Sequence, residues 1–415
     1  MRIHRAWVGL AITFLALLVS AGLRSAPGVM IRPLELSLGW DRATISLSVA
    51  IGILFYGLTG PFSAALTQRV GLRAIMIGGL LLMSAATFAS RWMSEPWQFL
   101  LSWGVVAGIG SGAVAPVLAA NVVNRWFARH KGLAMGILSA STATGALIFL
   151  PLFAWLAGDM AWRHVALAVS IAALAIIPLI FLLLPESPRA VGLARLGEEV
   201  AAETETPIDP PTLRPGALAT LHRAVGVPMF WLLAGTFFVC GLTTNGLIGT
   251  HLIAYCGHIG MASVVAAGML SMMGMLDIVG TTASGWLTDR YDPRKLLCIY
   301  YGLRGLSLIA LPFAGSDARS LTLFAVFYGL DWIATVAPTL ALANRSFGDR
   351  IAPIVFGWIM VAHQLGAATA AFGAGVIRSE TGSYVYAFML AGAFGVLAAF
   401  AILSMARPSR TMASA

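Results

Sequence analysis

Charged residues are scarce in this sequence. They make up 10% of its 415 residues, and 59% are hydrophobic. A soluble domain carries about 25% charged residues. The few polar residues are not enough to cover the surface of a soluble protein of this size. We therefore expect a membrane protein.

Cysteine and several functional motifs are also sparse or missing. The three cysteines, Cys240, Cys256 and Cys298, lie in or beside apolar runs and form neither a metal-ligand spacing nor a disulfide framework. No G-x-x-x-x-G-K-[ST] loop occurs and no zinc or catalytic-triad motif is found. The sequence therefore disfavours an ATP-driven pump and an intramembrane enzyme, and it predicts no metal or cofactor.

Apolar runs are long enough to cross a bilayer, which takes roughly 20 residues of helix. We predict about twelve such helices, at 6–31, 43–66, 74–92, 96–121, 131–157, 163–184, 228–254, 261–287, 294–315, 319–342, 351–378 and 383–405. The fold class expected is therefore all-α and membrane-spanning.

Basic residues are unevenly shared between the two sides of these spans. Most lie at the termini and in every second connection, as Arg125 and Lys131 do. This is the positive-inside pattern, which predicts an inner-membrane protein with both termini in the cytoplasm. The net charge of +9 is then topological, and no nucleic-acid partner is predicted.

The chain reads as two related halves. A polar, proline-rich connector predicts an N-terminal six-helix bundle at 1–185, a cytoplasmic linker at 186–227 and a C-terminal six-helix bundle at 228–415. A shift of about 221 residues superposes features of the halves, such as Gly108 on Gly329, and Ala115-Pro116 to within one residue of Ala337-Pro338. Repeats of this kind place a substrate between them, near the bilayer midplane.

Pro116 and Pro338 each lie deep inside a predicted span. Each proline removes one backbone hydrogen bond and can kink its helix. A gating motion and a static kink both fit this position.

One loop carries a family resemblance. The stretch Gly285-Trp-Leu-Thr-Asp289-Arg290-Tyr-Asp-Pro-Arg294-Lys295 resembles the G-x-x-x-D-R-x-x-R-K loop of the major facilitator superfamily, whose charges latch neighbouring helices. In the first half Arg69 and Arg73 remain, while Ala64 and Gln68 replace the glycine and the aspartate. The resemblance implies a latch of Asp289, Arg290 and Arg294, with Arg69 and Arg73 in the first half.

Two further stretches narrow the resemblance. Gly22-Leu-Arg24-Ser-Ala-Pro27-Gly28, followed by Gly39-Trp40-Asp41-Arg42, is similar to the start of monocarboxylate and oxalate–formate carriers. Asn124-Arg125-Trp126-Phe127 with Lys131-Gly132 is similar to their connection between helices 4 and 5.

Five ionisable residues lie within spans: Arg24, Asp277, Arg304, Asp331 and His363. Such residues are costly in a bilayer and are functional-site candidates by default. At a rise of about 1.5 Å per residue, the last four lie at similar depth, near the midplane.

Arg24 occupies the position where the resembling carriers place a cation for the substrate carboxylate. A guanidinium offers a planar fork that suits a carboxylate. The alternative is an arginine that extends to the membrane surface.

Asp277 matches a helix-8 aspartate of monocarboxylate carriers that is thought to take the transported proton. Those carriers have an arginine four residues later, where this chain has Thr281. The alternative is a structural ion pair between Asp277 and Arg304.

Asp331 is a second candidate for the proton site, and it also stands on a helix that the resemblance places at the cavity. It alternatively neutralises Arg304 or His363. His363 stands on the helix where oxalate carriers use a lysine. It would bind an anion when protonated, and the alternative is a neutral histidine hydrogen-bonded within the bundle. Arg304 is expected to be structural, because its helix is peripheral in this superfamily.

Tyr56 and Trp332 lie inside spans and either pack in the core or contact the substrate. We therefore expect a monomeric secondary transporter working by alternating access. Its substrate would be a small organic anion, a monocarboxylate by resemblance, moved with a proton or exchanged for another anion. Two alternatives stay open: a proton-coupled drug or cation exporter of the same fold, and a non-transporting membrane sensor.

Overall fold

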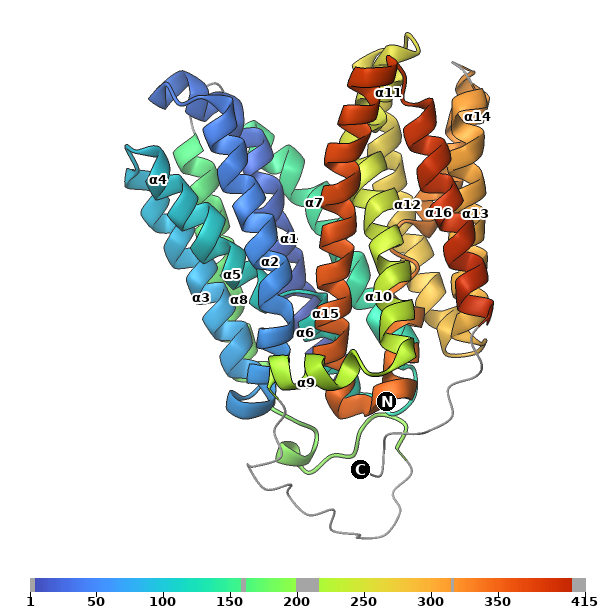
Figure 1. The fold of residues 1–415 in the computed structure, drawn as a ribbon. Helices are drawn as coiled ribbons and strands as arrows, with labels where there is room; N and C mark the ends of the chain where they lie inside the picture. Colours follow the sequence, from blue (N-terminus) through green and yellow to red (C-terminus); the bar gives the residue numbers. More distant parts are fainter. Residues whose placement is uncertain (1–3, 158–161, 199–215, 315–316, 405–415) are drawn as a thin grey trace. The chain divides into compact units, whose positions relative to one another are not determined.

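The computed structural model describes residues 4–157, 162–198, 216–314 and 317–404. These residues form helices and no β-strand (Figure 1). The all-α fold expected from the sequence is confirmed. Residues 199–215 of the predicted linker lie outside the described part.

The chain divides into two compact units, one of residues 1–134 and 141–220 and the other of residues 135–140 and 221–415. The helices of the first half are α1 (Arg5–Leu38), α2 (Arg42–Val70), α3 (Leu72–Ala89), η1 (Ser90–Trp92), α4 (Pro96–Phe99), η2 (Leu100–Val106), α5 (Ala107–Ala113), α6 (Pro116–Trp126), α7 (Lys131–Ala157), α8 (Trp162–Leu183) and η3 (Arg189–Val191). Next comes α9 (Ala217–Ala224).

The second half holds α10 (Pro228–Gly241), η5 (Leu242–Ile248), α11 (Gly249–His258), α12 (Ser263–Thr288), α13 (Pro293–Ala310), η6 (Leu311–Phe313), α14 (Ala318–Asp331), α15 (Val336–Thr381) and α16 (Val385–Ser404). In this unit α13 packs on α16, α10 on α15 and α12 on α14. In the first unit α2 packs on α5, and α3 on α5 and α8.

Among the described residues, 11 helical stretches are long and apolar enough to cross a membrane. Their bounds lie within a few residues of the predicted spans, except that α1 continues past the predicted end at 31 to Leu38. One stretch of 63 residues, Arg319–Thr381, covers two predicted spans. Gly348 (φ 77°, ψ 153°) breaks its helical geometry between them.

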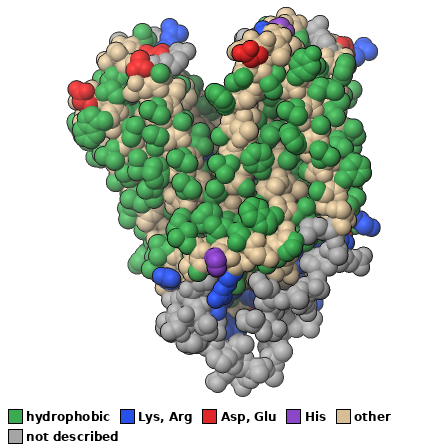
Figure 2. Space-filling model, in the orientation of Figure 1, with side chains coloured by type: hydrophobic (Ala, Val, Ile, Leu, Met, Phe, Trp, Pro, Cys, Tyr) green, Lys and Arg blue, Asp and Glu red, His purple; other side chains and the backbone are tan. Residues whose placement is uncertain are grey.

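The outer faces of the helices are apolar. Figure 2 shows hydrophobic side chains along the flanks of the helices and Lys, Arg, Asp and Glu side chains near their ends. Between helices, close contacts depend on small residues. The backbone of Gly280 on α12 lies against the carbonyl of Leu330 on α14, where any side chain would collide. Close backbone approach is a usual way for membrane helices to pack.

Two helices are interrupted at corresponding places. Helix α5 ends at Ala113, and α6 begins at Pro116 after non-helical Val114 and Ala115. Helix α14 ends at Asp331, and α15 begins at Val336, two residues before Pro338. The predicted kinks are therefore found as breaks that precede each proline. A shift of 221 residues places the first break beside the end of the second.

Candidate functional site

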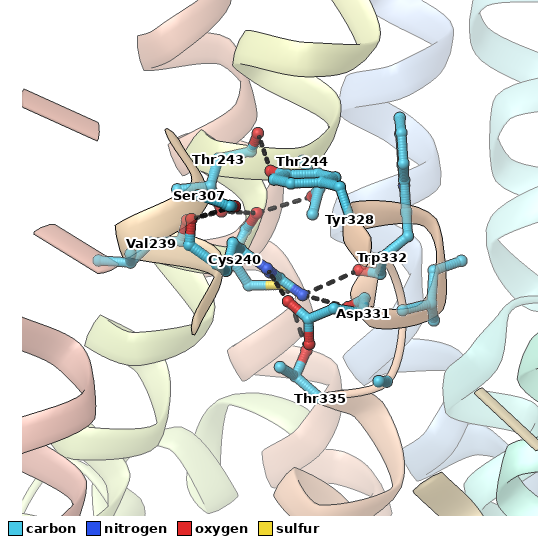
Figure 3. Close-up of polar contacts among 12 residues, drawn as sticks. Val239, Cys240, Thr243, Thr244, Ser307, Tyr328, Asp331, Trp332 and Thr335 are labelled. Carbon is cyan, nitrogen blue, oxygen red and sulfur yellow. Dashed lines mark hydrogen bonds and ion pairs between the residues drawn. The ribbon is translucent and has the colours of Figure 1, made fainter. Parts of the chain in front are cut away.

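The break between α14 and α15 is the centre of a buried polar cluster in the second unit. Residues Trp332–Thr335 form turns instead of helix, so their backbone groups lose regular helical partners. Backbone groups at membrane depth must find other partners within the protein. In this cluster several of those partners are side chains, drawn in Figure 3 around Asp331, Trp332 and Thr335.

Arg304 on α13 makes several of the contacts in this cluster. Its Nε donates to Oδ2 of Asp331 at 2.7 Å. Its Nη2 donates to the carbonyl oxygens of Asp331 and, at 3.2 Å, of Trp332. The Arg304 side chain is 0% exposed and that of Asp331 is 9% exposed. Arg304 thus neutralises Asp331 and also binds the carbonyls that follow the end of α14.

Asp277 on α12 holds the same break from another side. Its Oδ1 accepts the backbone N–H of Ile333 at 2.9 Å and the hydroxyl of Thr281 at 2.7 Å. Asp277 is 1% exposed. Within the described residues its carboxylate has no ion-pair partner, so the alternative of a pair between Asp277 and Arg304 is not what the structure shows.

Cys240 on α10 completes the cluster, and sequence reasoning missed this role. Arg304 Nη1 donates to its Sγ at 3.2 Å, and the hydroxyl of Thr335 lies 3.3 Å from the same sulfur. A cysteine within a hydrophobic run has the same pattern as a residue that only packs in the core. No local motif distinguishes this cysteine, and its role follows from the fold.

His363 and Trp332 lie at the edge of this cluster. The His363 ring lies 5.2 Å from that of Phe237, and in the described residues its Nδ1 has no hydrogen-bond partner although it is buried. Trp332 is partly buried and meets Tyr328 edge to face at 5.9 Å. The structure gives His363 no ion pair with Asp331.

Arg24 and Tyr56 come together in the first unit. The guanidinium carbon of Arg24 on α1 lies 4.4 Å from the centre of the Tyr56 ring on α2. Its Nη1 donates to the Ser20 hydroxyl at 3.2 Å. Across the described residues, no carboxylate pairs with Arg24. A cation over an aromatic face is held in place while its fork remains available to an anion.

The loop after α12 contains the latch residues of the resemblance. Asp289 caps the C-terminus of α12, and the Arg290 guanidinium lies 3.8 Å from the centre of the Trp286 ring. Arg294 pairs with Asp292 at 3.0 Å. The pKa of Asp292 lies below its ordinary value, chiefly because the Arg294 side chain donates to its carboxylate.

The corresponding region of the first half is organised by Glu186, which sequence reasoning missed. Its carboxylate accepts Nη1 of Arg125 at 2.5 Å and the backbone N–H groups of Leu72 and, at 3.1 Å, Arg73. The side chain of Arg73 donates to the carbonyl of Phe181. Arg69 lies in the last turn of α2. Gln68 stands where the loop motif has an aspartate. This replacement was the sequence signal that a carboxylate from elsewhere, here Glu186, takes part in this region.

Comparisons with known proteins agree on one family. Residues 13–371 match the family model of the Major Facilitator Superfamily. Monocarboxylate transporter 13 of Rattus norvegicus is 28% identical over 357 residues, which cover 85% of this chain and 78% of the relative. The gallate transporter of Pseudomonas putida is 24% identical over 414 residues, covering 96% of this chain and 91% of the relative.

The fold has counterparts among solved structures. The proton:xylose symporter XylE superposes with a TM-score of 0.74 at 15% identity, over 96% of this chain and 95% of that one. The match to the family model, the helix count and these relatives together indicate a multi-pass membrane transporter of small molecules and not an enzyme. The chain belongs to the major facilitator superfamily.

Proposed function

We propose that this transporter moves a small organic acid anion, a monocarboxylate, across the inner membrane together with a proton. Alternating access is the mechanism proposed, with both termini in the cytoplasm. The observation that carries the proposal is Arg24: a guanidinium within a membrane helix, stacked on Tyr56 and without a carboxylate partner among the described residues.

The chemistry of Arg24 supports an anionic ligand. A buried or half-buried cation in a membrane normally pairs with an acid, and the described part of the chain supplies none to Arg24. A substrate carboxylate would fill that role with two parallel hydrogen bonds. The names of the relatives point to the same class, since a monocarboxylate and gallate are both organic acids.

The charges of the second unit support a proton as the coupling ion. Arg304 is matched by Asp331, which leaves Asp277 as a carboxylate without a counter-ion in the described residues. An unpaired charge buried in an apolar interior is costly, and a bound proton removes the charge. We therefore assign the proton to Asp277. Asp331 is instead the ion-pair partner of Arg304.

Counterflow in proteoliposomes tests the proposal. Purified protein is reconstituted with an unlabelled organic acid inside, and uptake of labelled acids is measured at several pH gradients. Accumulation of an aromatic or aliphatic monocarboxylate, faster with an inward proton gradient, is expected. Uptake of a cationic dye with no accumulation of any acid would instead indicate the drug or cation exporter and contradict the proposal.

A further inference from the structure

The backbone of the break between α14 and α15 is held by side chains from two neighbouring helices. From α12, Asp277 accepts the N–H of Ile333, and the Ser284 hydroxyl donates to the carbonyl of Ala334 at 2.6 Å. From α13, Arg304 donates to the carbonyl of Trp332. These bonds replace the helical ones that the break removes, so the shape of the break depends on these side chains.

Among the described residues, the corresponding break in the first unit is held by uncharged groups. Val114 N–H bonds to the carbonyls of Gly110 and Ser111, and the Ser63 hydroxyl donates to the carbonyl of Ala113 at 3.2 Å. The side chain in these bonds is a hydroxyl that does not titrate in the physiological range. The break between α14 and α15 therefore differs in that a titratable carboxylate is bonded to its backbone.

The two oxygens of Asp277 are used unequally. Oδ1 accepts both recorded hydrogen bonds, from Ile333 and Thr281, and Oδ2 accepts none from the described residues. A proton can therefore add to Oδ2 without displacing a partner. Hydrogen bonds to an ionised acceptor are roughly twice as strong as neutral ones, so a proton on Oδ2 weakens the hold of Oδ1 on Ile333.

The charged and titratable groups that face Asp277 come from three other helices. They are Arg304 on α13, Asp331 at the end of α14 and Cys240 on α10. Arg304 is already bonded to Asp331 and to Cys240. These groups are bonded to one another and not to the Asp277 carboxylate, so a change in its protonation acts on the two bonds to Oδ1, from Ile333 and Thr281.

We propose that Asp277 clamps the segment Trp332–Thr335 and that a proton on its carboxylate opens this clamp, which turns proton binding into bending between α14 and α15. Thr281 is a positioning residue that aims Oδ1 at Ile333. The inference rests on the proposed function only in taking a proton as the coupling ion.

Hydrogen–deuterium exchange of the full chain in lipid nanodiscs measures how firmly the backbone amides of the segment Trp332–Thr335 are held. In Asp277→Asn, the peptide containing residues 332–336 is expected to exchange roughly tenfold faster than in the wild type, because a hydrogen bond to a charged acceptor is replaced by a neutral one. In the wild type, acidification should raise exchange of this peptide relative to the peptide at 114–118, after correction for intrinsic rates. Asp277→Asn should show no such dependence.

Two adjacent threonines provide a matched pair of variants. Thr281 donates to Asp277, whereas the hydroxyl of Thr282 donates to the carbonyl of Ile278 within α12. Thr281→Val is expected to speed exchange of the 332–336 peptide, and Thr282→Val is expected to leave it unchanged. If Asp277→Asn does not fold, the threonine pair and the wild-type pH series carry the test.

Equal exchange in Asp277→Asn and the wild type, or equal effects of the two threonine variants, would overturn the clamp. The measurement requires no transported substrate. Failure of every organic acid in counterflow would therefore remove the proposed function and leave the clamp standing. If an organic acid is transported but Asp277→Asn leaves the exchange of the 332–336 peptide unchanged, the clamp fails and the proposed function stands.

Discussion

Arg304 and Asp331 form a closed pair of charges inside the second unit. Nε of Arg304 lies 2.7 Å from Oδ2 of Asp331, and the same guanidinium binds the carbonyls of Asp331 and Trp332. The arginine therefore both neutralises an acid and caps the C-terminal end of α14, where a positive charge is favourable.

Removing one partner of this pair should cost far more stability than removing both. We expect Arg304→Met to lower the free energy of unfolding by roughly 3–5 kcal/mol, because it leaves Asp331 buried and unpaired. The double variant Arg304→Met with Asp331→Leu should lose less than Arg304→Met alone. Thermal unfolding of the purified proteins in detergent gives the comparison, and losses that simply add would contradict the pairing.

Arg24 should be essential for transport of an acid. We expect Arg24→Ala to abolish counterflow of the organic acid, and Arg24→Lys to retain a small part of it, because lysine keeps the charge and loses the planar fork. Arg32→Ala is the matched control, since Arg32 is an exposed residue of the same helix. Counterflow at wild-type rate in a folded Arg24→Ala protein would argue against the anion site.

Gly71 should tolerate no side chain. Its φ of 99° is unfavourable for other residues, and an added Cβ would lie 2.9 Å from the Glu186 carboxylate. We expect Gly71→Ala to cost about 1–3 kcal/mol of stability. In a Glu186→Ala background the collision disappears and the backbone strain stays, so the cost should shrink without vanishing. Measured thermal midpoints that give the same cost in both backgrounds would show that Glu186 does not crowd this position.

Asp292 should make stability depend on pH in the acid range. The pKa of Asp292 is lowered in the folded protein by hydrogen bonds from Arg294. The stability that this carboxylate contributes is therefore fully present above its unfolded pKa of about 3.9. That contribution is lost as the pH falls through the folded pKa. We expect Asp292→Asn to melt below the wild type at neutral pH and the gap to narrow on acidification. A gap that is constant with pH would be inconsistent with this ion pair.

Much of the fold could be predicted because bilayer thickness sets the length of apolar runs. The predicted span 163–184 corresponds to Trp162–Leu183, and 228–254 lies within Pro228–His258. The two π-helical segments, η2 and η5, were not predicted. They add one residue to a turn of an apolar helix, and the hydrophobic pattern carries no sign of that.

For the candidate site, the sequence predicted how deep the charged residues lie in the membrane. It did not predict which of them face one another. Counting residues from the helix ends placed Asp277, Arg304 and Asp331 at one level, and the structure brings the last two into contact. Which carboxylate meets the arginine depends on how each helix is rotated about its axis. The break after Asp331 turns backbone groups toward Asp277, and this contact depends on tertiary packing rather than on spacing.

The neutrality of the Arg304–Asp331 pair has an electrical consequence. A membrane voltage does work only on net charge that moves, about 2.3 kcal/mol per elementary charge for each 100 mV. The pair adds no net charge, so in the proposed transport cycle the voltage would act on Arg24, Asp277 and the anion and proton that they are proposed to bind. Empty, the two residues carry opposite charges that sum to zero. With a monoanion on Arg24 and a proton on Asp277, the sum is again zero. We therefore expect a transport cycle whose rate is insensitive to membrane potential.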